Sequence, residues 1–152
     1  MYKQAIDAAR HMLTDGGYTC VFLADGEEYC SKERGVKPLI TLLSLEKQFD
    51  NAVAADKTVG AGAAHLYVLL GVRALWANVI SDAAIKILED SAIEVFFGER
   101  VPHIINRRGD GICPIESAVE GAESSREAYE RIIEALDKLR QARDSDRRKE
   151  EK

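Results

Sequence analysis

Hydrophobic residues recur every three to four positions in several segments of the chain, and this period indicates helices. In residues 2–14, Ile6, Ala9 and Leu13 fall on one face, and Gly16-Gly17 ends the predicted helix. The same period, together with capping residues, predicts further helices over residues 36–47, 56–70, 82–90 and 124–142, and a helix that starts at Pro114. The chain therefore contains enough amphipathic helices to cover a sheet.

Strand patterns alternate with these helices. They cover residues 18–24, 27–31, 52–55, 73–80 and 93–97. Asp25-Gly26 is a strong signal for a two-residue hairpin turn of type I′, and this turn sets a register in which Val21 pairs with Cys30. Side chains alternate along a strand, so Cys20 and Cys30 point to opposite faces and we expect no disulfide between them.

The order of elements predicts the fold class. Two hairpin strands followed by strands that alternate with helices indicate an α/β protein, a three-layer α/β/α sandwich with a mixed five-stranded sheet. We expect an antiparallel start and a parallel remainder. The last helix opens with the capping box Ser124-Ser-Arg-Glu127 and should dock against the sheet. We expect one domain over residues 1–142 and a charged, frayed or disordered tail over residues 143–152.

Composition and charge narrow the classes of function. The chain has 152 residues, of which 46% are hydrophobic, and this is enough for one domain with a full core. A net charge of −5 argues against a protein that mainly wraps duplex nucleic acid. The longest nearly apolar run, residues 61–72, is too short to cross a bilayer, and the N-terminus lacks a signal-peptide core. We therefore expect a cytoplasmic protein with no membrane partner, and its three cysteines fit a reducing compartment.

The segment from His103 to Glu116 carries most of the candidate chemistry. Pro114 suits the first position of a helix and Glu116 the third, so Cys113 is the predicted N-cap. The N–H groups and the dipole of that helix favour a thiolate at Cys113. His103 is a candidate for proton transfer. Two further residues of the same loop, Asn106 and Arg107, are candidate ligand-binding residues.

A second candidate site follows the buried strand at residues 52–55. Asp56 is the predicted cap of the next helix, and Lys57 falls in its first turn, where a cation faces the positive end of the dipole. A bound anion would offset that cost, and Gly60 would let a flat ligand come close. The alternative is a close-packed helix whose lysine simply reaches water. The order of glycines and lysine does not match a P-loop.

A third segment, residues 33–38, links a hairpin strand to a helix start and could join the site. Arg34 and Lys37 are its candidate ligand-binding residues. Their charges could equally belong to the solvated surface.

Five blocks of the chain together resemble one protein family. They are residues 31–39 (SKERGVKPL), 54–60 (AADKTVG), 65–71 (HLYVLLG), 101–107 (VPHIINR) and 113–116 (CPIE). These blocks resemble the bacterial and archaeal family called domain of unknown function 1893, over about residues 5–140. The resemblance implies a cytidine-deaminase-like fold and, for known members, no settled biochemical activity.

The residues depart from the zinc motifs of deaminases. Those enzymes place His-x-Glu at one helix start and Pro-Cys-x-x-Cys at the next, so that three ligands hold Zn²⁺. Here the first start offers Asp56-Lys57-Thr58, and the second offers Cys113-Pro-Ile-Glu116. His103, Cys113 and Glu116 could supply three ligands, but capping alone explains Glu116. We expect no metal and no other cofactor.

Three hypotheses for the function remain open. The first is a pocket between the helix starts at Lys57 and Cys113 that binds a small anionic or nucleotide-like ligand, with Glu116 and Gly60 among its lining. The second is a metal-independent enzyme in which Cys113 is the nucleophile, Lys57 favours the thiolate or holds the oxyanion, and His103 or Asp56 transfers protons. The third is an RNA-binding module, in which Trp76 or Tyr67 stacks on a base unless both belong to the core. A homodimer is also left open.

Overall fold

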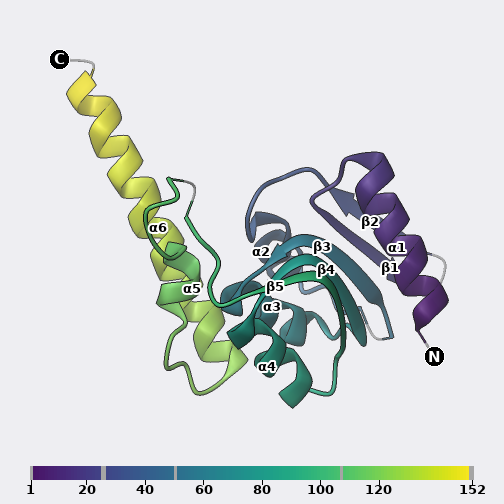
Figure 1. Cartoon of the computed structure of the whole chain (residues 1–152). Coiled ribbons are helices and arrows are strands. Elements are labelled where there is room, and N and C mark those ends of the chain that lie inside the picture. Colours follow the sequence, from purple (N-terminus) through teal and green to yellow (C-terminus); the bar gives the residue numbers. More distant parts are fainter. Residues whose placement is uncertain (1, 25–26, 50, 107, 151–152) are drawn as a thin grey trace.

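A mixed five-stranded sheet with the strand order β2-β1-β3-β4-β5 forms the centre of the fold (Figure 1). The computed structural model describes residues 2–24, 27–49, 51–106 and 108–150. Its elements in chain order are α1 (Lys3–Gly16), β1 (Cys20–Ala24), β2 (Glu27–Ser31), α2 (Lys37–Ser44), β3 (Val53–Val59), α3 (Ala61–Leu70), β4 (Ala74–Ser81), α4 (Asp82–Asp90), β5 (Glu94–Val101), α5 (Pro114–Ala118) and α6 (Ser125–Glu150). β2, β1 and β3 are antiparallel neighbours, whereas β3, β4 and β5 run parallel. The expected α/β class, with an antiparallel start and a parallel remainder, is confirmed.

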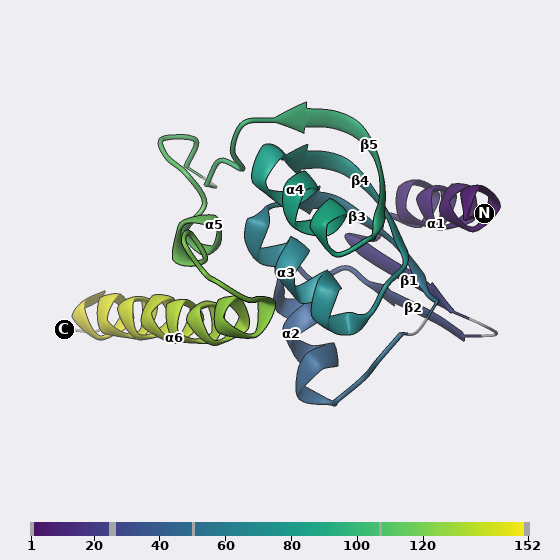
Figure 2. The same cartoon turned by 90° about the horizontal axis from the view of Figure 1, so that it is seen from below.

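Helices cover both faces of the sheet, and each face has its own hydrophobic cluster. α1 covers one face, where its buried residues pack against β1, β3 and β4 (Figure 2). These buried residues are Ile6, Ala9 and Leu13, as the helical period predicts. α2, α3 and α4 cover the other face and build the larger cluster, to which they contribute Leu39, Leu66 and Leu88. The candidate site lies on this second side.

The hairpin of β1 and β2 has the predicted register. Val21 pairs with Cys30 and Ala24 with Glu27, and the Asp25-Gly26 turn between them lies outside the described residues. Cys20 belongs to the cluster under α3, whereas Cys30 packs against the cluster under α1. The two thiols are therefore free and on opposite faces, as the alternation of side chains predicts.

The segment after the buried strand differs from the prediction. β3 continues through Asp56 as far as Val59, and α3 begins only at Ala61, with Gly60 as its N-cap. Pairing with the parallel neighbour β4 continues to Val59, and this long-range pairing outweighs the local capping signal of an aspartate. The prediction that Asp56 caps the helix and that Lys57 lies in its first turn is therefore wrong.

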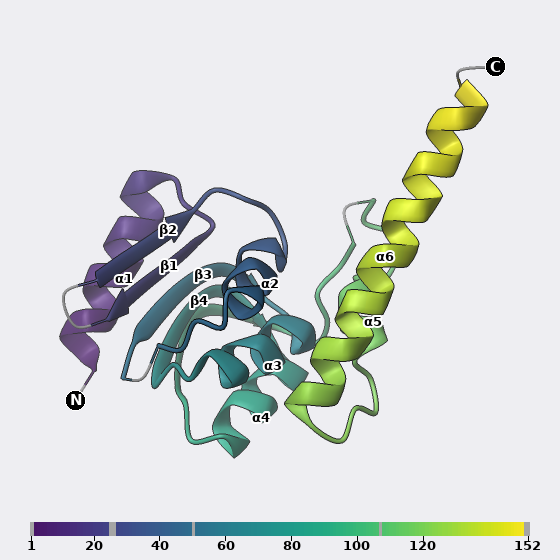
Figure 3. The same cartoon turned by 180° about the vertical axis from the view of Figure 1, so that it is seen from behind.

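α6 begins at the predicted capping box. The Glu127 N–H donates to the Ser124 hydroxyl at 3.1 Å, and the Glu127 carboxylate accepts from the N–H of Glu123 at 2.7 Å. The helix packs against α3 and α5 (Figure 3), and His65 Nδ1 lies 3.0 Å from the Ser125 hydroxyl. The expectation that α6 docks on the sheet is wrong, because its apolar face meets α3 and α5 instead.

The charged residues that follow residue 142 continue α6 to Glu150 and project away from the rest of the molecule (Figures 1 and 3). Every residue from 137 to 148 is exposed. The segment is thus helical where the sequence indicates a frayed or disordered tail, and the domain boundary at residue 142 stays a prediction. No helix in the described part of the chain combines the length and the apolar composition needed to span a membrane.

Candidate functional site

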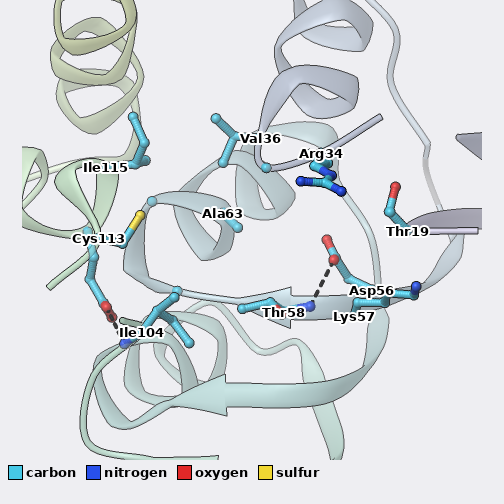
Figure 4. A pocket seen from close by; sticks show the side chains of 14 residues that line it. Thr19, Arg34, Val36, Asp56, Lys57, Thr58, Ala63, Ile104, Cys113 and Ile115 are labelled. Carbon is cyan, nitrogen blue, oxygen red and sulfur yellow. Dashed lines mark hydrogen bonds between the residues drawn. The ribbon is translucent and has the colours of Figure 1, made fainter. Parts of the chain in front are cut away.

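A cavity of about 340 Å³ lies where the C-terminal end of β3 meets α2, α3 and α5 (Figure 4). It is lined by Thr19, Arg34, Gly35, Val36, Asp56, Lys57, Thr58, Gly60, Gly62, Ala63, Ile104, Cys113, Ile115 and Glu116. The ends of parallel strands are the usual place for ligand sites in open α/β sheets. Segments that are far apart in the sequence therefore meet at a position where such folds bind ligands.

Asp56 is the buried carboxyl group of this cavity. It is 8% exposed, and its side chain points from the middle of β3 toward the end of the cavity that Thr19 and Arg34 line (Figure 4). Oδ1 accepts a hydrogen bond from the N–H of Thr58 at 3.2 Å, and Oδ2 accepts one from the Tyr67 hydroxyl at 2.6 Å. Burial disfavours the charged form and raises the pKa of Asp56 to about 7, although both hydrogen bonds act in the opposite direction.

A short hydrogen-bonded chain continues below Asp56 into the core. The Tyr67 hydroxyl lies 3.3 Å from Sγ of Cys20, so that a thiol, a phenol and a carboxyl group are linked in sequence. Burial raises the pKa values of both Tyr67 and Cys20 well above their ordinary values, and the nearby Asp56 charge acts in the same direction. Both groups are therefore protonated at neutral pH, and the Tyr67 hydroxyl is a donor to Asp56.

Glu116 reaches across to α3 and does not cap its own helix. Its Oε2 accepts from the N–H of Ile104 at 2.6 Å, and its Oε1 lies 3.4 Å from the N–H of Ala61, the first residue of α3. The side chain is 8% exposed. The expectation that Glu116 caps its own helix is therefore wrong, because the helix that it caps is α3, whose own N-cap Gly60 has no side chain. The positive end of α3 thus already has an intramolecular carboxylate.

Two glycines shape the walls of the cavity. A Cβ atom on Gly62 would lie 2.6 Å from Cγ2 of Ile115, so glycine is required for α5 to pack against α3. Gly35 has a φ of +66°, in the left-handed region, and lies between Arg34 and the start of α2. This turn brings Arg34 to the rim of the cavity.

Cys113 lies at the opposite end of the cavity from Asp56 (Figure 4). It is the N-cap of α5 and Pro114 follows it in the first turn, as predicted. Its side chain is half-buried and makes no capping hydrogen bond, whereas its backbone N–H donates to the carbonyl of Ile104 at 2.9 Å. α5 has only 5 residues, so its dipole is weaker than that of a long helix.

Comparison with known proteins identifies the family. The family model described as domain of unknown function DUF1893 (TM1506) matches residues 8–136. The chain belongs to the DUF1893 family. The crystal structure of a DUF1893 family protein (TM1506) from Thermotoga maritima is 25% identical to this chain, covers 90% of each chain and superposes with a TM-score of 0.75. No curated protein matches the chain. The family resemblance seen in the sequence is therefore confirmed, whereas the likeness to cytidine deaminases stays a prediction.

Six of the ten residues predicted for the site line the cavity of this DUF1893 protein, three do not, and one lies outside the described residues. The six are Arg34, Asp56, Lys57, Gly60, Cys113 and Glu116. Lys57 reaches the cavity from β3, and its side chain is exposed. In the view of Figure 4 its ammonium group lies beyond Asp56, on the side away from Cys113. The expected pair of helix starts at Lys57 and Cys113 is therefore not found. Cys113 is the N-cap of α5, whereas Lys57 belongs to β3.

The remaining predicted residues lie elsewhere on this DUF1893 protein. His103 is exposed, and Lys37 is an exposed residue that forms a 3.9 Å ion pair with Glu33. Asn106 organises its own loop, since its side chain bonds the N–H of Gly109 at 2.9 Å and the carboxylate of Asp110 at 2.9 Å. Arg107 lies outside the described residues. None of the three described residues lines the cavity.

No group of three or more His, Cys, Asp or Glu side chains that could hold a metal occurs within the described parts of the chain. The three ligands considered from the sequence are not gathered. Both oxygens of Glu116 face backbone N–H groups, and His103 is exposed. The donor set at this position does not fit zinc, which needs three or four ligands around one point.

Sequence reasoning missed several residues of the site. Tyr67 was considered only as a base-stacking or core residue, yet its hydroxyl holds Asp56. A signal was present, because a tyrosine in a buried and mostly apolar helix usually finds a hydrogen-bond partner. Thr19, Val36, Ile104 and Ile115 also line the cavity. They carry no local signal of their own, since their positions depend on how β1, α2 and α5 meet.

Proposed function

We propose that this DUF1893 protein binds a small nucleotide-like ligand in the cavity between Asp56 and Cys113. The observation that carries the proposal is the composition of the cavity, in which a buried carboxyl group and a guanidinium group share one end and much of the remaining wall is apolar. The apolar lining comes from Val36, Ala63, Ile104 and Ile115. Mostly apolar walls with a few convergent polar groups are typical of small-molecule sites.

The size of the cavity supports a small ligand. Its volume of about 340 Å³ is near the lower end of the range of about 300–1,000 Å³ that ligand pockets usually have. A base or nucleoside is in scale with this space, and a polymer is not. A phosphate would remain at the rim, where Arg34 and Lys57 are exposed.

Of the two ligand classes expected from the sequence, a small anion has less support than a nucleotide-like molecule. Glu116 already lies against the first N–H of α3, so a ligand anion would have to compete with it there. Gly62 and Ala63 also line the cavity, and within the described residues no hydrogen bond is found for their backbone N–H groups in the first turn of α3. They offer hydrogen bonds that a neutral carbonyl oxygen can accept.

The likeness to cytidine deaminases is part of the same proposal. The positions that the deaminase pattern gives to zinc ligands hold Asp56-Lys57-Thr58 and Cys113-Pro-Ile-Glu116 in this chain. Six of these seven residues line the cavity, namely Asp56, Lys57, Thr58, Cys113, Ile115 and Glu116. We propose that the ligand pocket of such a fold is kept here without its metal.

The two alternatives have weaker support. For a Cys113 nucleophile, a proton acceptor close to the thiol is required, but Asp56 lies at the other end of the cavity and His103 is not in its lining. For the RNA-binding module, the two rings expected to stack on a base are buried, since Tyr67 is 0% and Trp76 6% exposed. Trp76 lies instead under the Arg10 guanidinium, 4.9 Å from the ring centroid.

The test is a thermal-shift and calorimetric screen with ribonucleosides and their 5′-monophosphates. A ligand at 100 times its Kd stabilises a protein by about 2.7 kcal/mol, which is a rise in Tm of about 5–10 °C for a chain of this size. The Asp56→Asn variant should lose the shift, and Asp7→Asn, a matched change on the exposed face of α1, should keep it. If no member of the panel raises Tm, the proposal is wrong.

A further inference from the structure

Asp56 offers unused acceptor positions to the cavity. A carboxylate oxygen carries two lone pairs, and each oxygen of Asp56 uses one of them, on Thr58 N–H and on the Tyr67 hydroxyl. The backbone N–H of Lys57 also lowers the pKa of Asp56, but it donates to the carbonyl of Thr19 at 3.1 Å. Both oxygens belong to a side chain that is only 8% exposed, and they point toward the end of the cavity lined by Thr19 and Arg34 (Figure 4). A ligand N–H group can therefore bind this carboxylate without displacing either of its protein partners.

Arg34 supplies donors at the same end of the cavity. A guanidinium group has five N–H donors and no acceptor. Within the described parts of the chain, the Arg34 side chain makes no ion pair and no hydrogen bond, either with Asp56 or with any other residue. The carboxylate and the guanidinium thus face one space without being paired to each other.

The formal charges around this space cancel. Arg34 and Lys57 are the basic residues of the lining, and Asp56 and Glu116 are the acidic ones. An anionic ligand would be repelled by Asp56, and a cationic ligand by Arg34. Asp56 is buried and has free acceptor positions, and Arg34 has free donors at the rim, so the best ligand gives a donor to the carboxylate and an acceptor to the guanidinium.

We propose that Asp56 and Arg34 together recognise an amide edge on a neutral ligand, in which an N–H donor lies beside a carbonyl acceptor. The N–H group binds the Asp56 carboxylate, and the carbonyl oxygen accepts from Arg34. This inference rests on the proposed function, because it assigns a chemical class to the ligand of the same cavity. Tyr67, Cys20 and the backbone of Thr58 act only through Asp56, whose orientation they fix.

Three probes of nearly equal shape test which ligand charge the cavity prefers. Benzamide carries a neutral amide, benzoate an anion and benzamidine a cation, on the same phenyl ring. Their affinities are measured by ligand-observed NMR titration at pH 8, where Asp56 is mostly ionised because its pKa is about 7. We expect benzamide to bind about 10- to 100-fold more tightly than either charged probe, as loss of a hydrogen bond to a charged group implies.

Two variants should change the order of affinities, one in favour of the cationic probe and the other in favour of the anionic probe. In Arg34→Ala the guanidinium that repels a cation is gone, so benzamidine should gain affinity and benzamide should lose it. In Asp56→Asn the carboxylate that repels an anion is gone, so benzoate should gain relative to benzamide. Arg108→Ala and Asp7→Asn change exposed residues outside the cavity and should leave the order unchanged. Circular dichroism and Tm verify that each variant is folded.

The outcomes separate this inference from the proposed function. Equal affinities of the three probes, or an order that neither variant changes, overturn the amide-edge inference even where the ribonucleoside screen gives a binder. Binding of benzamide in the predicted order, with no ribonucleoside binder, supports the amide edge and overturns the nucleotide-like ligand. Absence of binding by every probe and every ribonucleoside overturns both.

Discussion

The Tyr67 hydroxyl donates a 2.6 Å hydrogen bond to Oδ2 of Asp56, and both residues are buried at the meeting point of β3 and α3. The two residues are 11 positions apart in the chain. The contact fixes the direction of the only acidic side chain that opens to the cavity from β3, within the described residues. It therefore links the packing of α3 on the sheet to the chemistry of the candidate site.

Replacing Tyr67 by phenylalanine tests this link. The variant loses a hydrogen bond to a buried acceptor, so the free energy of unfolding should fall by about 1–3 kcal/mol, as measured by urea denaturation. The pKa of Asp56 should rise further above its value of about 7, because the Tyr67 hydrogen bond lowers it. Carbon-detected NMR titration of the carboxyl group measures this change.

A matched control is available for the Tyr67 change. Tyr129 is half-buried on α6, and in the described structure its hydroxyl has no hydrogen-bond partner. Tyr129→Phe should alter the free energy of unfolding by less than about 0.5 kcal/mol. An Asp56 pKa that is the same in wild type and Tyr67→Phe would contradict the assigned hydrogen bond.

Asp56 should make the stability of the protein fall as pH rises. Its pKa is raised from 3.8 to about 7 by burial, so the folded state holds a proton that the unfolded state releases between these pH values. The stabilisation is fully present below pH 3.8 and is lost as pH rises to about 7. For a shift of this size the loss is at most about 4 kcal/mol.

The pH effect is isolated by comparison with Asp56→Asn, which cannot ionise at this position. The difference in unfolding free energy between wild type and this variant, measured from pH 4.5 to 8.5, should decrease as pH rises to about 7 and then level off. All other titrating groups cancel in that difference. A flat or rising difference would show that the Asp56 pKa is not raised in the folded state.

The sequence predicts the elements of this fold better than their contacts. The helical period of Ile6, Ala9 and Leu13 and the hairpin register of Val21 and Cys30 depend on local patterns, and both are confirmed. The helix over residues 82–90 has its predicted bounds because Ser81 caps it and its apolar face is regular. The strand from Asp56 to Val59 was missed, since only pairing with β4 distinguishes it from a helix start.

For the candidate site, the sequence singles out residues but not their relationships. Asp56 was expected as a cap and is a buried carboxyl group of a strand, and Glu116 was expected in its own helix and caps α3. Both depend on partners that are far away in the chain, namely Tyr67 and Ala61. Their roles in ligand binding stay predictions until the binding experiments are done.

The contact of Glu116 with α3 should stabilise the packing of α5. Replacing Glu116 by alanine leaves the N–H groups of Ile104 and Ala61 without an acceptor, and this should lower the free energy of unfolding by about 1–3 kcal/mol. Glu116→Gln keeps one carbonyl acceptor and should cost less. Glu120→Ala, at an exposed position nearby, is the control. Equal free energies of unfolding for Glu116→Ala and Glu120→Ala would show that the contact of Glu116 with α3 does not stabilise the protein.

Gly62 should be required for the approach of α5. Alanine favours a helix by about 1 kcal/mol relative to glycine, but here its Cβ would lie 2.6 Å from Cγ2 of Ile115. We expect Gly62→Ala to be destabilised by about 1–3 kcal/mol in spite of its helix propensity. The double variant with Ile115→Ala removes the clash, so its loss should be smaller than the sum of the two single losses. Additive losses would mean that the two side chains do not collide.

Alkylation of the three cysteines tests whether Cys113 opens to the cavity. Cys20 is 3% exposed and burial raises its pKa, and the pKa of Cys30 is also raised, so both thiols should react slowly at neutral pH. Cys113 is half-buried in the cavity lining and should react first with iodoacetamide, as measured by mass spectrometry of peptides. A ligand that fills the cavity should slow this reaction and leave the rate at Cys30 unchanged. Equal rates at all three cysteines would exclude the nucleophile hypothesis. If a bound ligand does not change the rate at Cys113, that ligand lies outside the cavity.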